Sequence, residues 1–290
     1  MVSWVPRVPC LYSVHSAEAF FTAFQGKSLY FLGDSQQREL FRHALGGLLA
    51  CCWAQSRRPG AGGVCNKEEV LNHTMCAEVE GFESYPTSPI VFEPTHSGRR
   101  VVFTFEWLGF PKEFGTDWHA ANLLAVLAGK APTPSAALMS WGHWDLIFTA
   151  PRRADNFQGY IEVLQYSKAI SDAFVAAMER GNKHLARVFT WRQMYPDEVD
   201  TLPHPQFKKR QVLPEFRALA REGFADLWGR GGKGGGVGLA LWDPYAKLEL
   251  QAPVREWNEN RLTTDGMHLK PEVDMELAWE LFSYWAESVL

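Results

Sequence analysis

The segment Ser28-Leu-Tyr-Phe-Leu-Gly33-Asp34-Ser35 marks a change from an apolar run to a helical pattern. The run from Ser28 to Gly33 predicts a buried strand. The residues that follow predict a helix over 36–52, because apolar side chains recur there at helical spacing. This order of elements places Ser35 at the N-terminus of a helix and at the carboxyl end of a strand. Backbone N–H groups at such a position can stabilise an oxyanion.

Strands and helices alternate along the rest of the chain. This pattern predicts an α/β fold with a mostly parallel sheet that helices cover on both faces. In such sheets ligands bind beyond the carboxyl ends of the strands, so residues that follow the strand ends are expected to share one edge. Besides the two elements above, we expect strands over 100–107, 136–141 with an extension over 145–149, 187–191 and 237–242, and helices over 157–180, 214–228 and 271–289.

The length suits one large α/β domain or two small ones. The chain has 290 residues, of which 46% are hydrophobic and 21% charged, and its formal net charge is -4. We expect one domain over 1–290, with a polar, cysteine-containing excursion at about 54–95.

The absence of a basic block argues against nucleic acid as a partner. No apolar run reaches the roughly 18 residues of a membrane helix, and no signal peptide is expected at Met1. The glycine-rich tract 229–238 lacks the ending of a phosphate loop and predicts a connector, so we expect no cofactor.

All five cysteines fall within the first 76 residues of the chain. This clustering favours local disulfides in an oxidising compartment, and a glycosylation sequon begins at Asn72 within the cluster. Reduced thiols and a chance sequon are the alternative. The spacing of cysteine and histidine matches no usual zinc site, so no metal is expected. The cysteines are Cys10, Cys51, Cys52, Cys65 and Cys76.

A base and a carboxylate that could serve a serine nucleophile occur near the end of the chain, in Thr264-Asp-Gly-Met-His268. A serine becomes a good nucleophile when a base takes its proton. An imidazole suits that role because the ordinary histidine pKa of roughly 6.5 is close to neutrality, and a carboxylate can hold the other ring nitrogen. We therefore predict that Ser35, His268 and Asp265 form a catalytic triad. Taken alone, each motif is also typical of a solvated turn or a helix cap.

These motifs resemble those of the SGNH/GDSL hydrolase superfamily. Within it, the chain is most similar to the PC-esterase group, which includes the plant trichome-birefringence-like polysaccharide O-acetyltransferases. The resemblance spans the chain from Trp4 to about Trp285, and the joint pattern carries it more than any single block. The blocks are Trp4-Val-Pro-Arg-Val-Pro-Cys10, Gly26-Lys-Ser-Leu-Tyr-Phe-Leu-Gly-Asp-Ser-Gln-Gln-Arg38, Phe103-Thr-Phe-Glu-Trp107, Ser140-Trp-Gly-His-Trp144 and Asp265 to Pro271.

The resemblance implies a three-layer α/β/α sandwich of the SGNH type and acyl transfer through a serine acyl-enzyme. The favoured activity is O-acetyl transfer from an acyl donor, either an acetyl ester or a donor derived from acetyl-CoA, to the hydroxyls of a glycan acceptor. Hydrolysis of O-acetyl esters by the same triad is the first alternative, and a non-catalytic glycan-binding or signalling protein is the second. A metal-dependent hydrolase would need more ligands than Asp265 and His268. The resemblance also implies the secretory pathway, in the Golgi lumen or outside the cell, and a further segment before Met1.

One departure from this group concerns the oxyanion hole. The asparagine of the superfamily's GxND block has no counterpart here, because Trp144 occupies that position. The oxyanion hole must therefore be built differently. We expect the Ser35 backbone N–H to act together with Gly142 or His143, and Gly109 is a further candidate.

Several residues near the motifs have more than one interpretation. Arg38, one helical turn after Ser35, binds a carboxylate or the acyl donor, orients Asp34, or forms a structural ion pair. Glu39 follows it, where the plant proteins usually carry Asn. His143 lines the pocket or is a structural histidine. The chain has 12 tryptophans, and those at the predicted strand ends either stack on sugar rings or belong to the core. They are Trp107, Trp141, Trp144 and Trp191.

Overall fold

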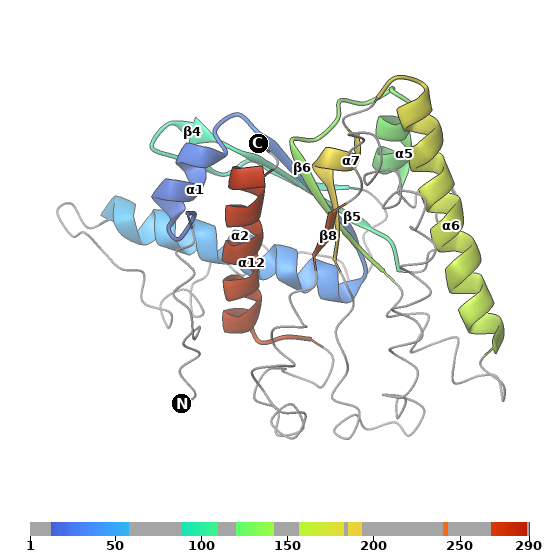
Figure 1. The fold of residues 1–290 in the computed structure, drawn as a ribbon. Coiled ribbons are helices and arrows are strands. Elements are labelled where there is room, and N and C mark those ends of the chain that lie inside the picture. Colours follow the sequence, from blue (N-terminus) through green and yellow to red (C-terminus); the bar gives the residue numbers. More distant parts are fainter. Residues whose placement is uncertain are drawn as a thin grey trace, which may run out of the picture.

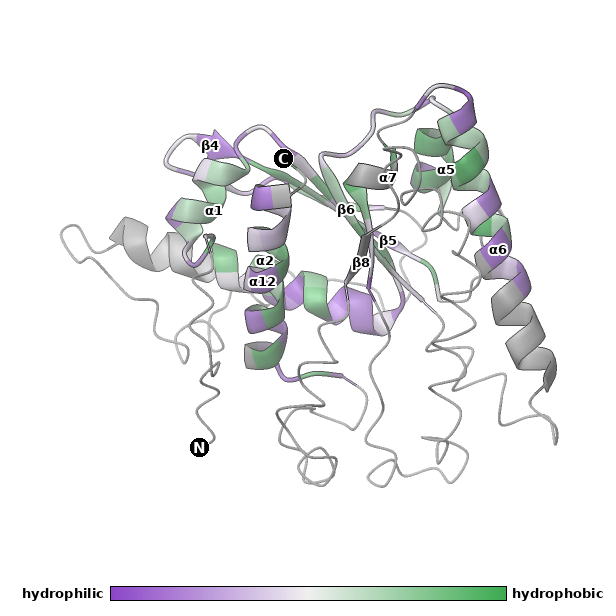
Figure 2. Ribbon diagram, viewed as in Figure 1, coloured by the Kyte–Doolittle hydropathy of each residue, from purple (hydrophilic) through white to green (hydrophobic). Residues whose placement is uncertain are grey.

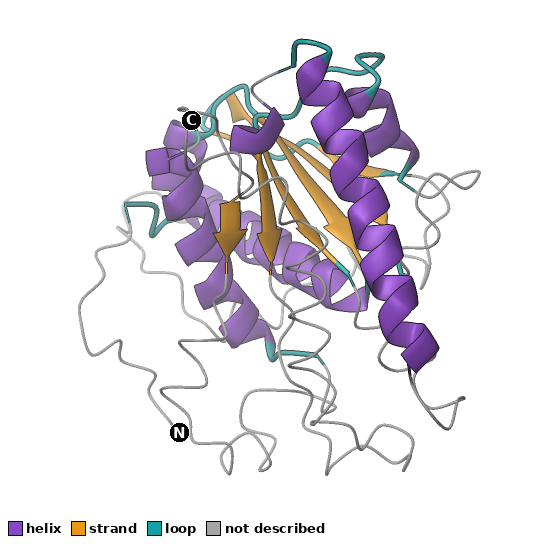
Figure 3. Ribbon diagram, turned by 45° about the vertical axis from the view of Figure 1, so that its right-hand side comes forward, coloured by secondary structure: helices purple, strands orange, loops and turns teal. Residues whose placement is uncertain are grey.

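The computed structural model describes residues 13–57, 89–109, 120–141, 157–182, 185–192, 240–242, 268–288 and 290. Its centre is a six-stranded sheet (Figures 1 and 3), in which neighbouring strands run parallel except for one pair at the edge. The expected α/β fold with a mostly parallel sheet is therefore confirmed. The strands are β1 (Ser28–Gly33), β2 (Ile90–Phe92), β5 (Val102–Trp107), β6 (Ala136–Ser140), β7 (Phe189–Arg192) and β8 (Ala240–Trp242). They lie in the order β2-β5-β1-β6-β7-β8, and β2 with β5 is the antiparallel pair.

Helices from both halves of the chain pack against this sheet. Figure 1 shows α1, α2 and α12 together at one side of the sheet, and α5 with α6 at the other. A small hairpin of β3 (Thr95–His96) and β4 (Arg99–Arg100) contacts α1, where Glu18 binds both His96 and Arg99. None of the helices in the described ranges combines the length and the apolar character needed to cross a membrane. The helices are α1 (Ala17–Ala23), α2 (Ser35–Arg57), α5 (Ala121–Leu127), α6 (Phe157–Glu179), α7 (Leu185–Val188) and α12 (Pro271–Ser288).

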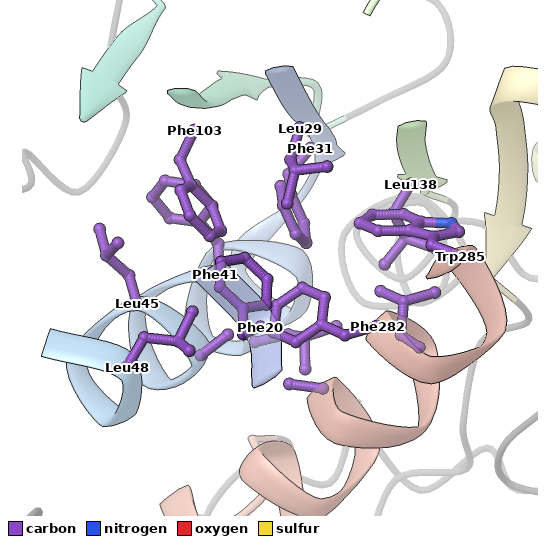
Figure 4. Close-up of a cluster of buried hydrophobic side chains, with 14 of the residues drawn as sticks. Phe20, Leu29, Phe31, Phe41, Leu45, Leu48, Phe103, Leu138, Phe282 and Trp285 are labelled. Carbon is purple, nitrogen blue, oxygen red and sulfur yellow. The ribbon is translucent and has the colours of Figure 1, made fainter. Parts of the chain in front are cut away.

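Strand β1 lies in the middle of the sheet and is buried on both faces. Leu29 and Phe31 belong to a first core cluster with side chains of α1, α2 and α12, whereas Tyr30 and Leu32 belong to a second core cluster with α5 and α6. A parallel strand covered on both faces is typically an unbroken apolar run for this reason. Figure 2 shows the strands of the central sheet as mainly hydrophobic and the first turns of α2 as hydrophilic. Figure 4 shows the first core cluster, in which the rings around Phe31 are those of Phe41, Phe103 and Trp285.

Most of the predicted elements within the described residues are present, with shifted ends. Helix α2 begins at Ser35 and continues to Arg57, into the range expected to be an excursion, and β2 lies in the same range. The strand expected over 187–191 is wrong at its start, because residues 185–188 form α7 and the strand begins at Phe189. Leu185 and Phe189 are four residues apart and both lie in the second core cluster. A helical turn brings them to one side, and this burial outweighs the strand preference of Val188.

Two further short helices were not indicated by the sequence pattern. Helices α1 and α5 are each 7 residues long, which is too short to display a clear helical period. The elements expected over 145–149, 214–228 and 237–239 lie outside the described residues. So do Cys10, Cys65, Cys76 and the sequon at Asn72, and the disulfide and glycosylation expectations stay predictions.

Candidate active site

Gly33 is the last residue of β1 and lies beside the last residues of both neighbouring strands. It pairs with Trp107 of β5 and with Ser140 of β6, and its carbonyl oxygen accepts a hydrogen bond from the Leu108 N–H at 2.9 Å. A Cβ atom on Gly33 would lie 2.2 Å from the Ser140 carbonyl oxygen and 2.7 Å from the Cβ atom of Gln37. The absence of a side chain therefore allows α2 to begin this close to the end of β6.

Asp34 caps the first turn of α2. Its Oδ1 atom accepts a hydrogen bond from the Gln36 N–H at 3.0 Å, and its carbonyl oxygen accepts one from the Arg38 N–H at 2.9 Å. These are the contacts of an N-cap residue, which satisfies N–H groups that have no partner inside the helix. The buried Asp34 carboxylate thus fixes the turn, and Ser35 takes the first helical position.

His268 reaches Ser35 from the far end of the chain. Its Nε2 atom lies 3.0 Å from the Ser35 Oγ atom, a hydrogen-bond distance, although 233 residues separate the two. His268 comes shortly before α12, whose first turn is anchored by hydrogen bonds from the Val273 and Asp274 N–H groups to the Lys270 carbonyl, at 2.9 and 3.1 Å. The structure therefore brings the predicted nucleophile and the predicted base into contact where the two helices begin.

Arg38 and Trp107 contact each other close to the start of α2. The Arg38 guanidinium binds the Glu39 carboxylate, with Nη2 and Nε at 3.0 and 3.2 Å from Oε1, and lies 6.0 Å from the centre of the Trp107 ring. Trp107 is only 3% exposed and belongs to the first core cluster. The contacts of Arg38 are those of a structural ion pair, and the burial of Trp107 is that of a core residue. For each residue, this is the alternative to substrate binding. Gly109, which follows β5, is buried.

The other predicted site residues lie outside the described part of the chain. They are Gly142, His143 and Trp144, which follow β6, and Asp265, which precedes His268. The carboxylate of the triad and most of the oxyanion hole therefore stay predictions. Within the described ranges, no group of three or more His, Cys, Asp or Glu side chains is placed to hold a metal ion.

Sequence reasoning missed a set of polar side chains between α2 and α12. His43 Nδ1 lies 2.8 Å from Asp274 Oδ2, and His43 Nε2 lies 3.8 Å from Glu39 Oε2. Burial raises the pKa of Asp274, while the hydrogen bond with His43 and the nearby charge of Arg192 partly offset that rise. One sequence signal existed, namely the four-residue spacing of Ser35, Glu39 and His43, which puts them on one face of α2.

Two comparisons with known proteins found no match. No protein-family model matches the chain, and a search of the curated proteins found no significant match.

Proposed function

We propose that the chain is an SGNH-type acyl-transferring enzyme, with Ser35 as the nucleophile and His268 as the general base. The observation that carries the proposal is the 3.0 Å contact between His268 Nε2 and Ser35 Oγ. Ser35 also opens α2 just beyond the carboxyl end of β1, where the helix dipole favours developing negative charge. The proposal includes Asp265 as the third member of the triad and a three-layer α/β/α sandwich as the complete fold.

In the first half-reaction, the Ser35 oxygen bonds to the carbonyl carbon of an ester while its proton passes to Nε2 of His268. The carbonyl oxygen becomes an oxyanion. When this intermediate collapses, the bond to the leaving oxygen breaks, and that oxygen takes the proton from His268. In the second half-reaction, an acceptor hydroxyl gives its proton to His268 and bonds to the acyl carbon. Ser35 then leaves with the returned proton, and the enzyme is regenerated.

The oxyanion needs N–H donors at the start of α2 that the helix cap does not use. The Gln36 N–H donates to Asp34 Oδ1 at 3.0 Å and serves the cap. We therefore assign the Ser35 N–H, one residue earlier, as the donor from α2, and a backbone group that follows β5 or β6 as the second donor. Backbone groups from adjacent strand ends would then replace the asparagine that the chain lacks.

The acceptor decides the reaction class. A glycan hydroxyl makes the protein an O-acetyltransferase, and water makes it an O-acetylesterase, because the same Ser35–His268 pair serves both reactions. We favour transfer of an acetyl group to glycan hydroxyls because the sequence blocks resemble those of polysaccharide O-acetyltransferases. Hydrolysis is the second candidate because the same geometry of Ser35 and His268 supports it.

The test is covalent labelling of the purified chain with a fluorophosphonate probe, followed by mass spectrometry of the modified peptide. We expect an adduct on Ser35, no adduct in Ser35→Ala, and strongly reduced labelling in His268→Ala. Ser171→Ala is the matched control, because Ser171 is buried on α6 and its hydroxyl has no hydrogen-bond partner among the described residues. Wild-type labelling of Ser35→Ala would refute the proposal.

A second incubation separates the two reaction classes. The wild type is mixed with an acetyl donor and an oligosaccharide, and both products are measured by mass spectrometry. Acetylated sugar that disappears in Ser35→Ala supports transfer. Acetate release without acetylated sugar would exclude the transferase and leave the esterase.

A further inference from the structure

A polar cluster lies between α2 and α12 and consists of Glu39, His43, Asp274 and Arg192. His43 stands between two carboxylates, with Nδ1 2.8 Å from Asp274 Oδ2 and Nε2 3.8 Å from Glu39 Oε2. Glu39 also binds Arg38 and Arg42, at 3.0 and 3.2 Å. The cluster therefore connects two successive turns of α2 to the first turns of α12.

Arg192 joins the cluster from the end of β7. Thr190, two residues earlier, accepts a hydrogen bond from the indole N–H of Trp285 on α12 at 3.3 Å. Because side chains alternate along a strand, Arg192 lies on the same face of the sheet. Its side chain is 0% exposed, and none of its three nitrogens has a hydrogen-bond partner among the described residues. Its charge favours the ionised form of Asp274 and so opposes the rise in the pKa of Asp274 that burial causes.

A buried polar cluster of this kind joins two helices at a cost in desolvation free energy. Buried charges cost several kcal/mol of desolvation, and apolar side chains of similar size often give equal or greater stability. The same two helices do use an apolar contact nearby, since a Cβ atom on Gly47 would lie 2.3 Å from the Cε atom of Met275. Directional hydrogen bonds can specify a register that apolar packing leaves less defined, and this would be the benefit of the polar cluster.

We infer that His43 and Asp274 are positioning residues for the proposed reaction, and that their hydrogen bond holds α2 and α12 in the register that places Ser35 Oγ against His268 Nε2. His43 follows Ser35 by eight residues on one face of α2, about 12 Å along the helix axis. Asp274 follows His268 by six residues, in the first turn of α12. The inference rests on the proposed function, because it concerns how the same site is held. A displacement of about 1 Å between reacting groups can lower a rate about 10²-fold.

The rate at which the fluorophosphonate probe labels Ser35 reports this geometry. We expect His43→Leu to label about 10²-fold more slowly, because leucine fills the space but cannot bond to Asp274. His43→Asn is the rescue variant, since its amide nitrogen takes the place of Nδ1, and it should label at close to the wild-type rate. Asp274→Leu, which has a similar shape but cannot accept the hydrogen bond from His43, is a second variant that should slow labelling in case His43→Leu does not fold. In the folded variants the KM for a small ester should change less than kcat.

Met275→Ala is the matched control, because it removes the neighbouring apolar contact between the same helices. It should lower the melting temperature and leave the labelling rate at the wild-type value. Wild-type labelling rates in both His43→Leu and Asp274→Leu, with a loss of thermal stability alone, would overturn the inference and leave the proposed function standing. A wild-type protein that forms no adduct on Ser35 would overturn the proposed function, and the inference with it.

Discussion

The Nε2 atom of His268 lies 3.0 Å from the Oγ atom of Ser35, although the two residues are 233 positions apart in the chain. Each is held by the start of a helix, Ser35 by the Asp34 cap of α2 and His268 by the first turn of α12. Helices α2 and α12 contribute side chains to the same core cluster on one face of the sheet. Packing of both helices on the same face of the sheet therefore brings the two polar residues near each other.

Replacing His268 with glutamine tests whether His268 acts as the general base for Ser35. His268→Gln keeps a polar side chain but removes the base, so we expect Ser35 to be labelled about 10²–10⁴-fold more slowly, the range that general bases contribute. Labelling kinetics measure the effect, and circular dichroism checks the fold. The exposed His15 provides the control, since His15→Gln should react like the wild type. An unchanged rate in His268→Gln would show that Ser35 reacts without this histidine.

The start of α2 could be predicted from the sequence because the contacts that make it are local. Gly33, Asp34 and the Gln36 N–H lie within a few residues of one another. The apolar run of the strand, the capping residue and the helical spacing of apolar side chains therefore predict where α2 begins. The polar cluster could not be predicted in this way. His43 and Asp274 are 231 positions apart, and they meet only after α2 and α12 have packed on the sheet.

Two other differences have the same origin in long-range packing. Helix α7 replaces an expected strand start, because Leu185 and Phe189 are both buried in the second core cluster. Trp107 looked from the sequence like either a sugar platform or a core residue, and the sequence could not decide between them. Its burial depends on Arg38 and on neighbours from other elements, none of which a local pattern contains.

Removal of the Asp34 side chain should weaken α2 and disturb Ser35 together. Asp34→Ala leaves the Gln36 N–H without its cap, so we expect the free energy of unfolding to fall by about 1 kcal/mol. Urea unfolding followed by circular dichroism measures this loss. Asp34→Asn keeps an oxygen at the capping position and should lose less. Equal losses in the two variants would contradict a capping role.

A methyl group at Gly33 should be poorly tolerated because of what lies around it. Gly33→Ala would place its Cβ atom 2.2 Å from the Ser140 carbonyl oxygen, and we expect a loss of about 1–3 kcal/mol, as in overpacked cores. The start of α2 would also move, so Ser35 labelling should slow. Gly129→Ala is the control, because nothing lies within 4 Å of its Cβ position and only its φ of +69° is strained. Gly129→Ala should be less stable than the wild type but should label Ser35 at the wild-type rate. Slower labelling in both variants would point to a general effect of destabilisation.

Glu106 is a buried carboxylate that connects β5 to β1 and to the start of α5. The Tyr30 hydroxyl donates a hydrogen bond to its Oε2 atom. The N–H groups of Asn122 and Leu123 donate to Oε1 and Oε2, at 2.9 and 3.3 Å. Burial raises the pKa of Glu106 above its ordinary value of 4.5, although these hydrogen bonds oppose the rise. The folded chain therefore holds a proton on Glu106 more tightly than the unfolded chain does.

This raised pKa gives the stability of the protein a specific pH dependence. The contribution of a group whose pKa is higher in the folded state is fully present below the unfolded value, here 4.5, and is lost as the pH rises through the folded value. Glu106→Gln has no such proton. We therefore expect the free energy of unfolding of the wild type, relative to that of Glu106→Gln, to rise as the pH is lowered from neutral towards 4.5, as measured by urea unfolding. Asp274, another buried carboxyl group with a raised pKa, is present in both proteins and cancels in the difference. A difference that stays constant over this range, or that grows with rising pH, would mean that the pKa of Glu106 is not raised by folding.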